Sequence, residues 1–386
     1  MDNTQINQLV NSIFKEENGS VTIANENLQN VVDQGKEILG DYNTKDIFTN
    51  VLIDKIGKTI FVNRAYDPIA PSVLRNAVEY GSVVQKIDAD APEAGPNMSW
   101  ELKNGQSYDP NIFTAPTVRQ KFFDMQSTFE IPLSYVDEQL HQSFDGPAQL
   151  GAFINMLRTK VKNSASVYTN GIIRRTINNF TGETLYNAYS GGTTFTQAGN
   201  TRAVNLLARY KAANSASLTA EQAVTDPDFI RYAVKYIRDY VGYMRDMSTL
   251  FNMEGRNRHT PRDLQHIVML DYFASAADIY LQSDVWHNEL TRFPDYETIP
   301  YWQGSGTDLA FGSVSKIDVT TSAGHDVEAS GILAVIFDRD ALGLWNYDEH
   351  VTTHYNPRAE FWNNWYKYKA RYFNDFAENF VVFFVA

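Results

Sequence analysis

The clearest pattern of apolar positions along the chain is helical and lies between residues 147 and 180. Leu150 and Ile154 begin a face on which apolar residues recur three or four positions apart. Asp145 is a suitable N-cap, and Pro147 is tolerated in a first turn because its missing N–H has no intrahelical partner there. The pattern predicts one helix over residues 147–180, which at 1.5 Å per residue would be about 50 Å long.

Before this helix the chain shows two weaker patterns. Residues 1–47 are polar with short apolar helical faces, which predicts an N-terminal arm that needs a partner surface. Residues 85–132 contain four prolines within 25 positions and two alternating stretches, and Asn104-Gly105 suits a tight hairpin turn. We interpret residues 85–132 as a long two-stranded excursion with little core of its own. A loop of this length inside a compact domain is usually functional or bound to a partner.

After a Gly/Thr/Asn-rich linker over residues 181–201, short helices alternate with buried strands. Apolar runs predict strands at 267–270 and 332–337, because they are short and rich in branched side chains. The intervening patterns predict helices at about 202–213, after Asp226-Pro227 and at 274–286, and a short helical turn at 338–342. Residues 202–344 are therefore expected to form a compact α/β region.

The last 40 residues have the pattern of strands and turns. Tyr366–Tyr372 alternates, with three tyrosines and Ala370 on one face and Lys367, Lys369 and Arg371 on the other. Twelve aromatic residues lie among the 32 residues from Tyr355 to Ala386, and the chain ends on an apolar strand. The whole pattern indicates an α+β fold with an aromatic-rich terminal sheet.

Composition excludes several classes of protein. The 386 residues include no cysteine, which excludes disulfide scaffolds, thiolate nucleophiles and Cys-ligated metal sites. The net charge of −13 disfavours tight binding to nucleic acid, because Lys and Arg supply the affinity for phosphates. No run of 18 apolar residues and no signal-peptide pattern occurs, so we expect a protein made in the cytoplasm with no membrane partner.

A search for catalytic, cofactor and metal motifs finds little. There is no phosphate-binding loop, and Gly304-Ser-Gly306 lacks the third glycine of a dinucleotide site. His350 and His354 share a strand face and could touch one ion, although solvated histidines are the commoner case. Asp338 and Asp340 fit the start of a helix better than a carboxylate pair. We therefore predict no enzyme, no cofactor and no metal, and keep a carbohydrate-active protein as an alternative suggested by the aromatic face.

Four features together resemble a known family. They are an N-terminal arm and long hairpin before the helix at Pro147, a central α/β region ending in Asp338-Arg-Asp340, the turn Asn356-Pro357-Arg358 followed by aromatic residues, and a closing strand over 376–385. Their order resembles the major capsid protein of tailed bacteriophages with the Hong Kong 97-type (HK-97-like) fold. The likeness is greatest to the short-tailed phi-29-like phages. A different virion component, of the tail or connector, is the other alternative.

The resemblance implies a division of the chain and a function. Its parts are an N-terminal arm (1–47), a peripheral domain with the long spine helix (48–65, 133–200 and 345–386), an extended loop (66–132) and an axial domain (201–344). The protein is then expected to be a structural subunit that self-assembles in the host bacterial cytoplasm into the icosahedral shell of the virion, enclosing a double-stranded DNA genome.

The resemblance also implies partners and contact residues. Copies of the chain would meet in hexamers and pentamers, with a scaffolding protein during assembly, a portal protein at one vertex, and packaged DNA bound only loosely because the chain is acidic. Tight, sequence-independent retention on DNA would contradict that last expectation. The candidates for contacts between subunits are Trp100, Leu102, Lys103, Phe361, Trp362 and Trp365.

Overall fold

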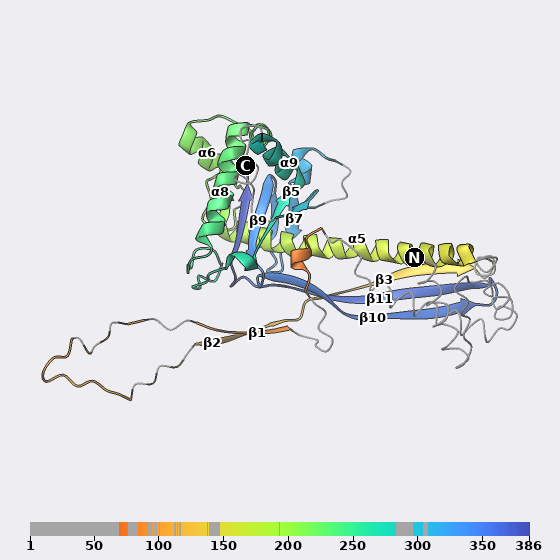
Figure 1. Ribbon diagram of the computed structural model, residues 1–386, viewed down its shortest axis with the longest axis horizontal. Coiled ribbons are helices and arrows are strands. Elements are labelled where there is room, and N and C mark those ends of the chain that lie inside the picture. The colour runs from red at the N-terminus through yellow and green to blue at the C-terminus, as the bar shows by residue number, and fades with distance from the viewer. Residues whose placement is uncertain are drawn as a thin grey trace.

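The computed structural model describes residues 69–75, 84–90, 94–95, 97, 99, 101–111, 113, 115, 117–136, 138, 147–192, 194–282, 296–303 and 308–386. Three parts are visible in Figure 1: a compact upper body, a flat sheet under a long helix, and a two-stranded hairpin that projects away from both. The fold is mixed α+β, as expected. The predicted N-terminal arm and Trp100 lie outside the described residues.

The long helix α5 (Pro147–Ala188) contacts the two largest sheets of the molecule. It begins at the predicted proline but has 42 residues, about 63 Å, and extends eight residues beyond the predicted end. The extension is helical because its side chains are buried: Leu185 is fully buried, and Thr184 donates its hydroxyl to the carbonyl of Phe180 at 2.8 Å. The sequence 181–188 looked like a linker because its Thr and Gly residues have modest helix propensity, and tertiary packing overrides that preference.

Beneath the helix lies a three-stranded antiparallel sheet in the order β10 (Leu342–Asn356), β11 (Phe361–Asn374), β3 (Gln126–Val136). Its upper face is aromatic. The ring of Phe129 lies between those of Tyr168 on α5 and Tyr368 on β11, at centroid distances of 4.1 and 4.9 Å. The predicted alternation along β11 is confirmed for its tyrosines, which are buried. Arg371 departs from it and is also buried, because β11 there enters the junction of the two sheets and is covered on both sides.

The upper body is built on a five-stranded sheet in the order β4 (Ala203–Asn205), β12 (Phe380–Phe384), β9 (Ile332–Asp338), β5 (Gln265–Leu270), β6 (Glu297–Ile299). All seven residues of β9 are buried, as expected of a central strand. Helices α6 (Leu206–Asn214), α8 (Pro227–Tyr243) and α9 (Asp271–Gln282) pack around this sheet (Figure 1). The remaining short elements are η1 (Pro71–Val73), α7 (Ala220–Ala223), η3 (Arg262–Leu264), α10 (Phe311–Val314), β7 (Ile317–Thr320) and β8 (Asp326–Ala329).

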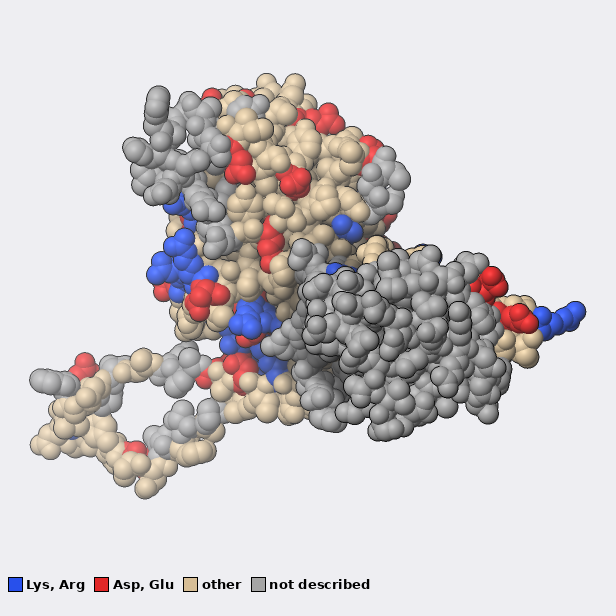
Figure 2. Space-filling model, turned by 45° about the vertical axis from the view of Figure 1, so that its right-hand side comes forward, with Lys and Arg blue, Asp and Glu red and all other residues tan. Residues whose placement is uncertain are grey.

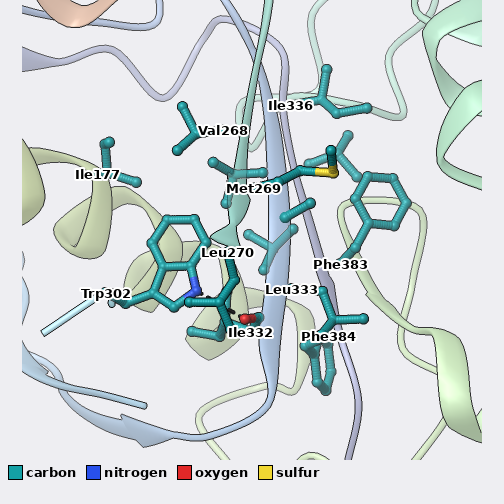
Figure 3. Packing of buried hydrophobic residues seen from close by; sticks show 14 of the residues in the cluster. Ile177, Val268, Met269, Leu270, Trp302, Ile332, Leu333, Ile336, Phe383 and Phe384 are labelled. Atoms are coloured by element: carbon teal, nitrogen blue, oxygen red, sulfur yellow. Dashed lines mark hydrogen bonds between the residues drawn. The ribbon is translucent and has the colours of Figure 1, made fainter. Parts of the chain in front are cut away.

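The core of the upper body is continuous with α5. Figure 3 shows Ile177 of the helix beside Trp302 and the strands β5, β9 and β12. Trp302 is fully buried, and its indole N–H donates to the carbonyl of Ile332 at 2.8 Å. Asn178 of α5 donates to the carbonyl of Trp302 at the same distance. These two hydrogen bonds join the helix to the sheet through Trp302.

Several predicted boundaries need correction. The last strand, β12, lies between β4 and β9 in the five-stranded sheet, whereas the sequence grouped all of residues 345–386 with the long helix. Residues 126–132 belong to β3 of the lower sheet and not to the projecting hairpin. The segment after β9 is a tight turn into β10 instead of a helical turn. Helix α9 begins at Asp271 rather than Ala274.

Long-range pairing explains the misplacement of β12 and of residues 126–132, because an apolar run does not reveal which strand it pairs with. Within the described residues no helix is both long and apolar enough to cross a membrane.

The position of Phe383 generates a stability prediction. This side chain is fully buried in β12, whereas Phe122 of the hairpin is 63% exposed. We expect Phe383→Ala to lower the free energy of unfolding by about 3–5 kcal/mol, since the site cannot close over the lost ring. Phe122→Ala, the matched control, should cost about 0.5 kcal/mol or less. Chemical denaturation measures both, and equal effects would contradict this packing.

Candidate functional site: the extended hairpin and its ionic anchor

The projecting hairpin is formed by β1 (Val84–Ala89) and β2 (Val118–Phe123), which pair in antiparallel register. Beyond them the chain runs to a distant tip (Figure 1). The predicted turn at Asn104-Gly105 is present there: Gly105 has φ +87°, and the N–H of Gln106 donates to the carbonyl of Lys103 at 3.2 Å. Such a positive φ is the conformation that glycine adopts most readily.

An ordinary surface hairpin turns its apolar face to the body and its charged face to solvent. In this hairpin the charged face lies against the body. The face toward its own body carries Lys86 and Asp88 of β1 and Lys121 of β2, all partly buried. The opposite face is open to solvent and carries three large apolar residues, Ile87 64%, Phe122 63% and Val118 60% exposed, with Gln85 and Gln120 opposite Phe122 and Ile87. We call these three residues the outer face. Residues alternate between the faces of a strand, so turning charges inward necessarily turns the apolar side chains outward.

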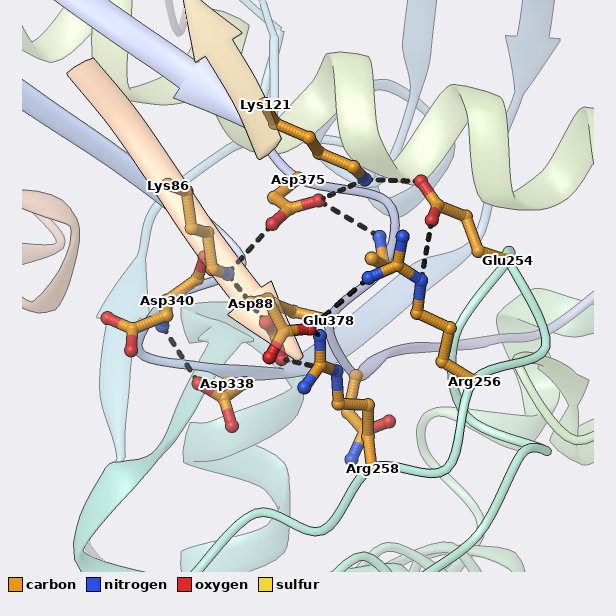
Figure 4. Close-up of polar contacts among 12 residues, drawn as sticks. Lys86, Asp88, Lys121, Glu254, Arg256, Arg258, Asp338, Asp340, Asp375 and Glu378 are labelled. Carbon is orange, nitrogen blue, oxygen red and sulfur yellow. Dashed lines mark hydrogen bonds and ion pairs between the residues drawn. The ribbon is translucent and has the colours of Figure 1, made fainter. Parts of the chain in front are cut away.

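The inward charges contact a set of charges on the body, which together we call the ionic anchor. It comprises four cations and four anions, Lys86, Lys121, Arg256, Arg258, Asp88, Glu254, Asp375 and Glu378 (Figure 4). Figure 2 shows blue and red atoms side by side where the hairpin joins the body, while the hairpin farther out is largely uncharged. The anchor is therefore charge-balanced and confined to the hairpin's base.

Asp375 is the central acceptor of the anchor. Lys86 and Lys121 stand directly opposite one another across β1 and β2, an arrangement of like charges that is unfavourable by itself. The carboxylate of Asp375 removes the conflict, because one oxygen lies 2.8 Å from Nζ of Lys86 and the other 2.8 Å from Nζ of Lys121. Its side chain is 2% exposed. It projects from the turn between β11 and β12, so the hairpin is fixed where the two sheets meet.

The remaining pairs extend the anchor on both sides. Glu378 lies 2.5 Å from Lys86, and Lys121 also pairs with Glu254. Asp88 pairs with Arg258 and lies 3.2 Å from Arg256.

These contacts shift the pKa values of the anchor's acids and bases. Burial raises the pKa of Asp375, but hydrogen bonds from Lys121 and Lys86 outweigh it and leave the pKa below its ordinary value. The hydrogen bond from Arg258 lowers the pKa of Asp88. Burial acts to lower the pKa of Lys86, yet its bonds to Asp375 and Glu378 raise it overall. All three groups are thus held in their charged forms.

The residues predicted for subunit contacts fall into two separate places. Leu102 is 65% exposed near the hairpin tip, and the N–H of Lys103 donates to the hydroxyl of Tyr108 at 3.3 Å. Phe361 and Trp365 are half-buried at the far end of the lower sheet, on the other side of the molecule (Figure 1). Trp362 is buried in its own subunit, 4.8 Å from the ring of Tyr355.

The histidines and aspartates considered for metal binding or catalysis lie in β10 and at the end of β9. His350 and His354 lie on the extended strand β10, where four residues span roughly 13 Å, so their imidazoles cannot share one ion. Asp338 accepts hydrogen bonds from Thr260 and from the backbone of Asp340. Residues 304 and 306 lie outside the described part of the chain. Within that part, no group of three or more His, Asp or Glu side chains is arranged to hold a metal ion.

Sequence reasoning missed the body's half of the anchor. Glu254, Arg256 and Arg258 lie in a loop with no periodic pattern, and Asp375 and Glu378 lie in a turn. Alternation along β1 would assign Ile87 to the core and Lys86 and Asp88 to solvent, which is the reverse of what the structure shows.

Comparison with protein-family models matches residues 10–384 to the Phi29-like phage major capsid protein family. The chain belongs to that family. The protein is accordingly a structural, non-enzymatic component of the virion, the major capsid protein that forms the head shell of a tailed phage. The resemblance found in the sequence is confirmed, and the carbohydrate-active and tail or connector alternatives are set aside.

Two solved structures are similar to this chain at low sequence identity. A chain in a structure of the head fiber and inner core protein gp22 of native bacteriophage P68 is 10% identical over 83% of this chain and 86% of its own, with a TM-score of 0.51. A chain from the capsid of Staphylococcus phage Andhra is also 10% identical, over 81% and 83%, with a TM-score of 0.46. A comparison with the curated proteins gives no match.

The buried carboxylate of Asp375 generates a pH-dependent prediction. Asp375→Asn should lower the free energy of unfolding by about 3 kcal/mol at neutral pH, because two lysines lose a charged partner. Since the folded-state pKa lies below the ordinary 3.8, this stabilisation is present above pH 3.8 and is lost as pH falls through the folded-state value.

Denaturation curves of the wild-type and Asp375→Asn proteins between pH 7 and pH 2 test this. The difference between them should be constant above pH 3.8 and shrink below it. Asp90→Asn, which affects an exposed pair with Arg119, is the matched control and should cost about 1 kcal/mol or less. A difference that persists unchanged to pH 2 would show that the charge of Asp375 contributes nothing.

Proposed function

We propose that the head shell is held together in part by the outer face of the hairpin, which packs on a neighbouring copy of this chain. The observation that supports this is the reversal of the hairpin's two faces. An isolated two-stranded hairpin is at best marginally stable, and this one turns its apolar side chains away from its own subunit. A shell of identical subunits supplies the missing surface.

The composition of the outer face and tip fits a contact between proteins. Ile87 is the diagonal neighbour of both Val118 and Phe122 on the paired strands, and Leu102 and Phe113 are 65% and 85% exposed beyond them. Apolar side chains clustered in this way are typical of the centre of an interface. Trp100, Lys103, Phe361, Trp362 and Trp365 remain candidates for further contacts between subunits. Of these, buried Trp362 would act by supporting its neighbours.

The division into parts with separate tasks is also part of this proposal. The extended loop would end at Met125, before β3, instead of at residue 132, and residues 1–47 would be the N-terminal arm. The lower sheet with α5 would be the peripheral domain, and the upper body the axial domain around five-fold and six-fold centres. β12 is the exception, since it pairs within the upper body's sheet. Scaffolding and portal proteins are the expected assembly partners, and the net charge of −13 favours loose contact with DNA.

Substitution of Phe122 on the outer face tests the proposed contact. Phe122→Gln removes an apolar anchor from every such contact at a cost of about 2 kcal/mol each, so the subunit concentration needed for assembly should rise by tenfold or more. The unassembled subunit should remain folded, because the side chain is 63% exposed.

The matched control is Phe122→Leu, which keeps the apolar character and should assemble nearly as well as the wild type. Light scattering and negative-stain microscopy, with scaffolding protein present, follow the formation of shells. Shell formation by Phe122→Gln at the wild-type concentration would contradict the proposed contact.

A further inference from the structure

The base of the hairpin is built as a joint. Strands β2 and β3 belong to different sheets, yet only Asp124 and Met125 separate them. Among the described residues, one aromatic contact crosses this joint: the rings of Phe123 and Phe373 lie 5.1 Å apart. On the side of β2, the hairpin therefore meets its body through a short link and a small apolar contact.

The hairpin strands also meet the body through a set of charged contacts. Six ion pairs cross from the hairpin to the body, two each from Lys86, Lys121 and Asp88. Their side chains are between 2% and 33% exposed, so water reaches the edge of the anchor but not its centre. Charged hydrogen bonds fix direction more strictly than apolar contacts do, because they lengthen and weaken as soon as the geometry changes.

If the hairpin moved away, the two arginines of the body would keep an anionic partner, whereas Asp375 and the three charged residues of the hairpin would exchange their partners for water. On the body, Arg256 lies 3.0 Å from Glu254 and Arg258 lies 3.6 Å from Glu378, and neither contact involves the hairpin. The hairpin carries two cations and one anion of the anchor, and the body carries two cations and three anions. Opening the anchor thus exposes ions, which water solvates, and leaves the apolar core covered.

We propose that the ionic anchor is a latch that holds the hairpin in one direction relative to the body. When the ion pairs of the anchor break, the hairpin turns about Asp124-Met125 and the body stays folded. The latch sets the direction in which each subunit presents its outer face to a neighbour. The latch would thereby control the proposed contact between subunits, and its role in assembly rests on that proposed contact. The motion itself is a property of the single subunit.

Distances between two spin labels, measured by pulsed electron paramagnetic resonance on unassembled full-length subunits, test the latch. The chain has no cysteine, so Ser107→Cys near the hairpin tip and Ala213→Cys on α6 accept labels at those two sites alone. Both positions are exposed. The wild-type anchor should give one narrow distance distribution. Lys86→Met/Lys121→Met, which removes four of the six crossing pairs, should broaden or shift it.

Three further variants make the result decisive. Asp88→Asn removes the other two crossing pairs and leaves the body's own pairs in place, so it should also broaden the distribution even if the double lysine variant fails to fold. Lys86→Arg/Lys121→Arg keeps the charges and should retain the narrow peak. Lys235→Met breaks an exposed pair on α8, far from the anchor, and should have no effect.

Circular dichroism confirms in each case that the body is folded. A narrow, unshifted distribution in folded Asp88→Asn subunits would overturn the latch, as would a broad distribution in the wild type. Neither result depends on shell formation, so failure of the latch and failure of the proposed subunit contact are distinguishable.

Discussion

The two largest sheets of this capsid protein pack against the same helix, and the arrangement of the whole subunit depends on that packing. The middle of α5 covers the aromatic face of the lower sheet through Tyr168, and the part that follows enters the core of the upper body at Ile177 and Phe180. Phe180 stacks on Phe380 of β12 at 4.0 Å, which joins the helix to the strand that follows the junction. A helix shared in this way makes the two sheets a rigid pair.

The hairpin is attached at the same junction but by different forces. Apolar burial holds the body together and is insensitive to small changes of direction, whereas the anchor is built from charges that require defined partners and angles. Asp375 joins the two systems, because it lies in the turn between β11 and β12 and accepts hydrogen bonds from both hairpin strands. A rigid body with a separately fastened arm suits a subunit that must meet several identical neighbours.

The sequence predicted local features of this structure better than long-range ones. The start of α5 at Pro147, the Asn104-Gly105 turn and the buried tyrosines of β11 follow from capping, turn chemistry and alternation, which are read over a few residues. The placement of β12 inside the upper sheet depends on pairing with β4 and β9 and has no local signature. The anchor was missed for the same reason, since its body residues come from loops far apart along the chain.

The central claim is that the outer face of the hairpin is completed by a neighbouring subunit while its charged face stays on its own body. Electron cryomicroscopy of assembled shells tests this most directly, by comparing the surroundings of Ile87, Val118 and Phe122 with those of Asp375. We predict that the three apolar side chains, at least 60% exposed in the single subunit, are buried against another copy and that Lys86 and Lys121 still contact Asp375. An outer face open to solvent throughout the shell would contradict the claim.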